Sequence, residues 1–198
     1  MISKSKIVLV KKNILPTLLI CDSQAVKNAD TADVDTKGFC RYKATNGIKR
    51  HLCVDVLGTP FFLICTPANV SDDEGFLRLF SENIDFFKAL PVISEEYALT
   101  ILFDSGYNKS NIEKRMQFLY PDILSKIRIE IAAKMSPEEK KKKGLSGFIV
   151  IHKRWIVERS NSWIDKCRIL WKNCASSLKT SEAEIRLCFI RLILRRLC

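Results

Sequence analysis

Residues 97–107 read YALTILFDSGY, an apolar run typical of a buried strand that ends in a polar tip at Asp104. Ser110 and Glu113 follow with the spacing of a capping box, which predicts a helix as far as about Leu119. The alternating segment 127–133 (IRIEIAA) then predicts another strand. A strand, a helix and a strand in this order indicate the α/β class.

The segments on the amino-terminal side add strands to this unit. Residues 17–21 (TLLIC) form a short apolar run, which predicts a buried strand with Asp22 at its exit. The polar segment 25–47 shows no sustained period and is predicted to be a long loop. Segments 48–57 and 60–66 are rich in β-formers and meet at a Gly-Thr pair, which predicts an antiparallel hairpin. The sheet should therefore be mixed.

Further helices complete the pattern. A capping box at Ser71 and Glu74 predicts a helix over about 72–88. From about residue 153 the segment KRWIVERSNSWIDKCRILWKNC is predicted to be helical, and a last helix opens at Ser181. Between them we expect a capping box at 136–139, a solvated lysine run at 140–143 and a short strand or connector at 148–151.

Composition narrows the function classes. The 198 residues are 47% hydrophobic, enough for one domain with a core. The net charge is +11, and the whole excess lies in residues 140–198, which hold 15 basic and 4 acidic side chains. A basic block on an otherwise neutral domain suits a phosphate-binding face, because binding releases cations condensed on nucleic acid. A merely solubilising surface is the alternative.

Membrane, secreted and zinc proteins fit the sequence poorly. The longest apolar runs, such as 61–65 and 187–194, are too short to span a membrane, and the apolar residues 7–10 are too short for a secretory signal. We therefore expect a cytoplasmic protein. The eight cysteines show no C-x2-C spacing, so neither a disulfide framework nor a zinc site is expected, and most should pack as small hydrophobes.

Three acidic residues occupy positions that a plain core does not require. Asp22 and Asp104 end two apolar strands, and Glu158 lies on the polar side of its helix, opposite Ile156 and Trp163. Carboxylates that crowd together repel one another unless a cation lies between them, and Mg²⁺ prefers such oxygen ligands. A two-metal phosphoryl-transfer site is one interpretation. In the other, the aspartates form turns or caps and Glu158 pairs with Arg154 at i,i+4.

The chain resembles the DDE transposases of bacterial insertion sequences, and is most similar to insertion-sequence type five, a group related to type four. The resemblance runs in order from about residue 20 to 198, and the RW-x-x-ER block is its most specific part. The segments that carry it are DSQAVK (22–27), NGIKRHLCVDVLG (46–58), ANVSDDEG (68–75), FDSGY (103–107), KRWIVERSNSWIDKCRIL (153–170) and SEAEIRLCFIRLILRRL (181–197).

The resemblance implies an RNase H-like mixed β-sheet flanked by helices, with a catalytic, metal-binding triad of Asp22, Asp104 and Glu158. It implies two Mg²⁺ ions, with Mn²⁺ able to substitute, that activate water for cleavage at the element's end, after which the freed 3′-hydroxyl attacks target DNA. Type-four relatives have a Tyr, Arg, Glu, Lys signature. Arg154 and Glu158 match it, whereas Ile151 replaces the Tyr and Asp165 the Lys, with Lys166 one place later.

Double-stranded DNA, both transposon ends and target, is the implied partner, bound by a homo-oligomer in the bacterial cytoplasm, with no membrane partner. The candidate phosphate contacts that flank Glu158 are Arg154, Arg159, Lys166 and Arg168. Lys49, Arg50 and His51 should either contact DNA or hold their strand. Trp155 should either stack on an unpaired base or pack in the core. Asp55 and the acids at 72–74 have sufficient structural explanations and are left out of the site.

Family members usually carry a helical DNA-recognition region before the first catalytic strand. Here residues 1–16 are expected to form only a short extension, followed by the catalytic domain at 17–198. We therefore expect a truncated or frameshift-dependent part of a transposase. Two alternatives stay open: a non-catalytic, DNA-binding transposase remnant, and an RNase H-like nuclease or junction resolvase.

Overall fold

A computed structural model describes residues 8–10, 13–33, 36–94, 97–132 and 153–197, and its centre is one six-stranded sheet. A separate hairpin of β1 (Val8–Val10) and β2 (Asn13–Leu15) precedes the sheet. The strands of the sheet are β3 (Leu18–Lys27), β4 (Gly38–Cys40), β5 (Thr45–Val54), β6 (Pro60–Pro67), β7 (Leu99–Phe103) and β8 (Ile127–Ile131).

The order of the strands across the sheet is β6, β5, β3, β7, β8, and the short β4 also pairs with β5. β5 runs antiparallel to β3, and β6 antiparallel to β5. β7 runs parallel to β3, and β8 parallel to β7. An antiparallel hairpin extended on one side by parallel strands gives the mixed sheet of an RNase H-like α/β fold, so the predicted fold class is confirmed.

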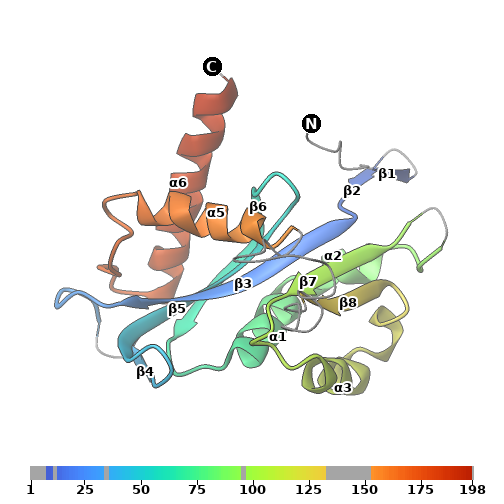
Figure 1. Ribbon diagram of the computed structural model, residues 1–198, viewed down its shortest axis with the longest axis horizontal. Coiled ribbons are helices and arrows are strands. Elements are labelled where there is room, and N and C mark those ends of the chain that lie inside the picture. The colour runs from blue at the N-terminus through green and yellow to red at the C-terminus, as the bar shows by residue number, and fades with distance from the viewer. Residues whose placement is uncertain (1–7, 11–12, 34–35, 95–96, 133–152, 198) are drawn as a thin grey trace, which may run out of the picture.

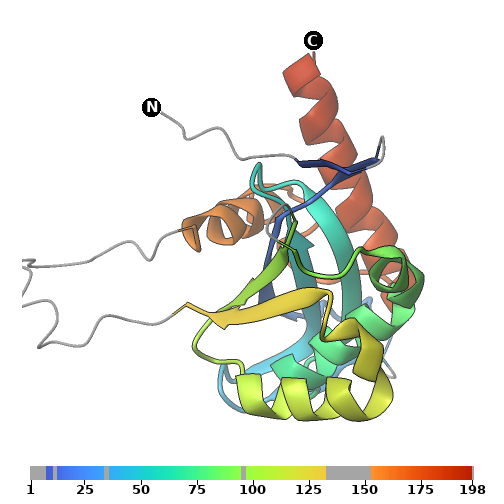
Figure 2. The same ribbon diagram turned by 90° about the vertical axis from the view of Figure 1, so that its right-hand side faces the viewer.

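Helices cover both faces of this sheet (Figures 1 and 2). Against one face pack α1 (Asp72–Glu82), α2 (Ile84–Ala89) and α3 (Lys109–Leu119), around a core that includes Phe76, Phe80 and Phe103. Against the other lie α5 (Trp155–Asp165) and α6 (Leu178–Leu197), with a second core that includes Ile20, Ile156 and Ile185. Successive strand residues point to opposite faces, so each strand supplies both cores. No helix in the described part of the chain is long and apolar enough to cross a membrane.

β3 extends further than its hydrophobic pattern indicates. It continues through polar residues to Lys27, and β5 begins at Thr45, so the predicted loop at 25–47 is strand at both ends and also contains β4. The two strands pair from Ile20 with Val54 to Lys27 with Gly47. Backbone hydrogen bonds between the two strands do not require apolar side chains, so the hydrophobic pattern of the sequence did not predict the polar half of β3. Asp22 therefore lies within the strand, and the prediction that it stands at the exit was wrong.

Two predicted helices are shorter in the structure. The helix expected over 72–88 is broken at Asn83, whose side-chain amide donates to the Leu79 carbonyl. The helix expected over 153–174 ends at Asp165, because the following segment turns to hydrogen-bond the end of β3 through Asn173. The features expected at 136–143 and 148–151 lie outside the described residues.

One cysteine pair differs from expectation. Cys21 of β3 and Cys53 of β5 are register partners with Cα atoms 4.2 Å apart, and they form a disulfide. Because they are 32 residues apart in sequence, only the strand pairing reveals that they are neighbours. The expectation of no disulfide is corrected for this pair. Cys40, Cys65 and Cys188 are buried free thiols, as predicted.

Candidate active site

Asp22 and Asp104 come from neighbouring parallel strands. Ile20 of β3 is the register partner of Leu102 of β7, and each aspartate lies two residues further along its own strand direction. Ile20 and Leu102 both belong to the core beneath α5 and α6. Because side chains alternate across a strand, the two carboxylates lie on the face that α5 covers.

Arg154 links the second aspartate to the glutamate. Its Nη1 lies 2.5 Å from Asp104 Oδ1, and its Nη2 lies 2.9 Å from Glu158 Oε1. The Arg154 side chain is 16% exposed, whereas Glu158, one helical turn later on α5, is 53% exposed. The i,i+4 pair that sequence spacing offered as an alternative is therefore present, but the same guanidinium also joins Glu158 to Asp104.

Asp22 is held in an environment that disfavours its charge. Burial raises the pKa of its carboxyl to about 6, although the backbone N–H of Ser23 and the charges of Arg154 and Lys43 act in the opposite direction. The nearby charge of Asp104 adds to the increase in this pKa. A cation at this position would relieve both the burial cost and the repulsion between the two aspartates.

A polar stripe of α5 faces these strands. Arg154, Glu158, Asn161 and Asp165 are spaced at four, three and four residues, which places them on one side of a helix. Asn161 Nδ2 donates to Asp22 Oδ2 at 2.9 Å. Gln24 Nε2 donates to both carboxylate oxygens of Asp165, at 2.9 and 3.1 Å. Hydrogen bonds along the stripe therefore fix α5 against β3.

Sequence reasoning missed two members of this contact, Asn161 and Gln24. Asn161 lies three residues after Glu158 on the same helical side, and Gln24 lies two residues after Asp22 on the same strand face. Both periodicities were visible in the sequence. Neither residue type is chemically distinctive, so spacing was the one available signal.

The donor set suits a hard divalent cation. Carboxylate oxygens are the ligands that Mg²⁺ prefers, and Asp22 carries a charge that its surroundings disfavour. Among the described residues, no three His, Cys, Asp or Glu side chains are close enough to form a ready-made metal site. The Arg154 guanidinium pairs with Asp104 and Glu158 instead and supplies positive charge between them. The chemistry of the donor set therefore fits a divalent cation, while Asp104 and Glu158 are paired with Arg154 in this structure.

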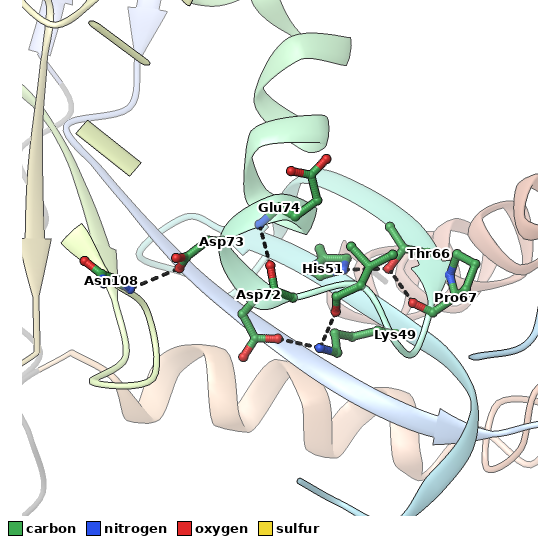
Figure 3. Close-up of polar contacts among 10 residues, drawn as sticks. Lys49, His51, Thr66, Pro67, Asp72, Asp73, Glu74 and Asn108 are labelled. Atoms are coloured by element: carbon green, nitrogen blue, oxygen red, sulfur yellow. Dashed lines mark hydrogen bonds and ion pairs between the residues drawn. The ribbon is translucent and has the colours of Figure 1, made fainter. Parts of the chain in front are cut away.

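Lys49 contacts Asp72 at the start of α1, and His51 contacts Thr66 of β6 (Figure 3). Lys49 is 7% exposed, and its ammonium donates to the Val70 carbonyl at 2.6 Å and to Asp72 at 2.8 Å. His51 is 2% exposed and lies 2.9 Å from the Thr66 hydroxyl, and burial lowers the pKa of its imidazole to about 4. These side chains hold β5 to β6 and to the start of α1.

Arg50 points to the opposite face of β5 and is also buried, at 2% exposure. Its Nη2 donates to the Leu170 carbonyl at 2.6 Å, and burial lowers the pKa of its guanidinium. With Lys49 and His51 it lies beneath the surface that DNA could reach. Of the two roles predicted for these three residues, their burial favours holding the strand over contacting DNA.

The remaining predicted DNA contacts lie on or just beyond α5. The Arg159 guanidinium lies over the rings of Trp155 and Trp163, at 4.6 and 4.9 Å from their centroids, and donates to the Leu57 carbonyl. Trp155 is 45% exposed and so is not a core residue. Lys166 and Arg168 are exposed and follow the end of the helix.

The acids that were left out of the site have structural partners. Asp55 accepts the backbone N–H groups of Leu57 and Thr59 in the turn after β5. Asp73 accepts the Asn108 backbone N–H, and Glu74 pairs with Arg78 and Arg115. Figure 3 shows the hydrogen bond from Asn108 to Asp73 and the pairing of Lys49 with Asp72 at the start of α1. The acids at 72–74 lie in the first turn of α1, as predicted, whereas Asp55, expected in mid-strand, lies in the turn after β5 ends at Val54.

Comparison with known proteins gives one match. The family model described as "Transposase DDE domain" matches residues 14–194, a span that includes Asp22, Asp104 and Glu158. Searches of curated proteins and of solved structures find no match. The family match covers most of the chain, and the sheet order agrees with an RNase H-like core. The chain therefore belongs to the transposase DDE domain family, whose members act on DNA.

Proposed function

We propose that this chain cleaves DNA strands and transfers them at the ends of an insertion sequence of the type five group, related to type four. The observation that carries the proposal is the placement of Asp22 and Asp104 at one level of adjacent parallel strands, with Glu158 joined to Asp104 through Arg154. Within a transposase DDE domain, these three acids are the candidates for the catalytic triad.

Asp22, Asp104 and Glu158 would hold two Mg²⁺ ions, for which Mn²⁺ could substitute. Bound there, the ions would lower the pKa of water and stabilise the entering and leaving oxygens of phosphoryl transfer. Arg154 must first release Asp104 and Glu158. A guanidinium freed from two carboxylates can instead make paired hydrogen bonds to a DNA phosphate beside the site.

The proposed reaction has two steps. A water oxygen attacks the phosphodiester at the element's end, the bond from phosphorus to the 3′-oxygen breaks, and a 3′-hydroxyl and a 5′-phosphate result. That hydroxyl then attacks a target phosphodiester, forming a new bond to phosphorus and releasing a target 3′-hydroxyl. Asn161 orients the Asp22 carboxylate through its amide hydrogen bond. His51 takes no part in proton transfer because it is buried on β5 with Thr66 as its partner.

Phosphate contacts are assigned to Arg154, Arg159, Lys166 and Arg168, with a homo-oligomer assembled on transposon-end and target DNA. Because such contacts release condensed cations, DNA binding should be sequence-tolerant and should weaken steeply with salt. The basic excess of residues 140–198 agrees with this behaviour. Equal affinity at low and high salt would contradict it.

The decisive experiment measures nicking of duplex DNA that carries the element's ends, with Mg²⁺, Mn²⁺ or EDTA. We expect metal-dependent nicking that falls at least about a hundredfold in Asp22→Asn, Asp104→Asn and Glu158→Gln, because each loses a ligand oxygen charge. Asp122→Asn, an exposed aspartate beyond α3, is the matched control and should retain activity.

The alternative function is a DNA-binding transposase remnant without catalysis. It is favoured by one observation, the engagement of two of the three acids in ion pairs with Arg154. Salt-sensitive DNA binding without nicking in any metal would support this alternative. Nicking that followed DNA structure and ignored terminal sequence would instead indicate a junction-resolving nuclease.

A further inference from the structure

The segment from Lys166 to Cys174, here called the basic loop, presents cations and apolar side chains to solvent. Lys166 and Arg168 are exposed, and Ile169 and Trp171 are 57% and 65% exposed. The Lys172 ammonium lies 4.5 Å from the centroid of the Trp171 ring. No acidic residue occurs between Lys166 and Thr180. An exposed indole among cations is a combination typical of nucleic-acid surfaces.

Buried residues of the same loop hold it in place. Leu170 is 2% exposed and packs in the core shared with α5 and α6, and its carbonyl accepts from the buried Arg50. Asn173 is 3% exposed, and its backbone bonds Lys27 and Ala29 at the end of β3. Its side chain bonds those of Asn28 and Ser181. The outward side chains are therefore presented by an anchored backbone.

The anchoring is energetically unusual. A guanidinium that is 2% exposed is costly to bury, and Arg50 directs one of its nitrogens to a backbone carbonyl of this loop. Two other nitrogens of Arg50, Nε and Nη1, have no hydrogen-bond partner within the described part of the chain. Holding the loop in this way requires burying the Arg50 guanidinium, and yet the loop leaves the Trp171 side chain in solvent. A binding partner that covers Trp171 explains this combination better than a contribution to folding stability alone.

From this arrangement we propose that the basic loop is a docking surface for duplex DNA beside the active site; the inference rests on the proposed function. Charge complementarity selects the partner, because the loop is purely cationic and duplex DNA is a dense polyanion. The loop meets β3 at Lys27, five residues beyond Asp22, or roughly 17 Å along the strand. That distance corresponds to about five base pairs, so one duplex can reach both places.

Lys166, Arg168 and Lys172 contact phosphates, and Trp171 packs on the sugar-phosphate backbone. The proposal thus adds Trp171 and Lys172 to the assigned DNA contacts. It also places part of the DNA binding on residues other than the three catalytic carboxylates. Because phosphate contacts read no bases, the contribution of the loop is the same for transposon-end and unrelated duplexes.

The test is equilibrium binding of a duplex of about 30 base pairs in EDTA, followed by fluorescence anisotropy across a range of NaCl concentrations. In the triple variant Lys166→Gln, Arg168→Gln and Lys172→Gln, we expect affinity to fall at least about tenfold. The slope of log K against log salt should shrink by about two to three, because each phosphate contact contributes close to one unit. Trp171→Ala should weaken binding about fivefold, and Trp171→Phe should recover most of the loss.

The matched control carries Lys88→Gln, Lys109→Gln and Lys114→Gln, which remove the same charge from exposed positions of α2 and α3, the helices on the other face of the sheet. It should change affinity less than about threefold. A loop variant that behaved like this control while the wild type bound DNA would overturn the docking proposal alone. A Trp171→Ala variant that altered oligomeric mass but not DNA affinity would show a protein contact instead. Failure of the wild type to bind any duplex would overturn the proposed function as well.

Discussion

Asp22 and Asp104 stand at the same level of two neighbouring parallel strands, two residues beyond the register pair of Ile20 and Leu102. Their closeness follows from pairing of β3 with β7, although the residues are 82 positions apart in sequence. This placement raises the pKa of the Asp22 carboxyl to about 6, through burial and through the nearby charge of Asp104. The site therefore stores an unfavourable negative charge in the free protein.

Arg154 should compete with divalent metal for this charge. In Arg154→Gln, Asp104 and Glu158 lose their shared guanidinium, so we expect Mn²⁺ to bind about three- to tenfold more tightly in the absence of DNA. The free energy of unfolding without metal should fall by roughly 1 kcal/mol. Calorimetric titration with Mn²⁺ and urea unfolding measure the two effects. Lys114→Gln, which removes one exposed charge from α3 on the opposite face of the sheet, is the control, and unchanged Mn²⁺ affinity in Arg154→Gln would count against this competition.

Asp165 should stabilise the contact between α5 and β3. In Asp165→Lys, the two hydrogen bonds from Gln24 are lost and a positive charge is placed near the buried Arg50, whose charge Asp165 helps to stabilise. We expect the free energy of unfolding to fall by about 1–2 kcal/mol, measured in urea. Asp165→Asn keeps an acceptor oxygen and should lose less. Equal stability of the two variants would show that the Gln24 contact contributes little.

His51 should make the protein sensitive to acid. Its pKa is lowered from 6.5 to about 4 by burial, so above pH 6.5 the imidazole is neutral in both folded and unfolded chains. As the pH falls from 6.5 to 4, only the unfolded chain binds the proton, and the free energy of unfolding should decrease by roughly 3 kcal/mol. In His51→Gln this contribution to the pH slope should vanish. Urea unfolding at several pH values checks it, and identical slopes in variant and wild type would refute it.

Gly75 should be intolerant of any side chain. Helix α1 approaches β5 so closely that a Cβ at this position would overlap the His51 imidazole. Although Ala favours a helix over Gly, we expect Gly75→Ala to lower the free energy of unfolding by about 2–3 kcal/mol, because overpacking outweighs propensity. At Gly106 an added Cβ meets nothing within 4 Å, so Gly106→Ala is the matched control and should change stability by less than about 0.5 kcal/mol. Thermal unfolding of both variants measures the difference.

Local patterns in the sequence were sufficient for much of the fold. The apolar run before Asp104, the alternation of β8 and the capping box of α1 each depend on neighbouring residues, and the structure has all three elements. The polar half of β3 and the break at Asn83 were missed. Those features depend on pairing with β5 and on a side-chain hydrogen bond, and neither leaves a periodic hydrophobic signal.

For the candidate site, the sequence by itself determined that Asp104 follows a buried strand and that Glu158 lies on the polar side of a helix. Only the tertiary structure decided that Asp22 lies within β3 beside Asp104, that Arg154 joins two of the acids, and that Arg50 and His51 are buried. The physical reason is the distance along the chain over which each interaction acts. Periods of two and 3.6 residues place a side chain on its own element, whereas strand pairing and helix docking between distant segments determine which charges meet and which lose their water.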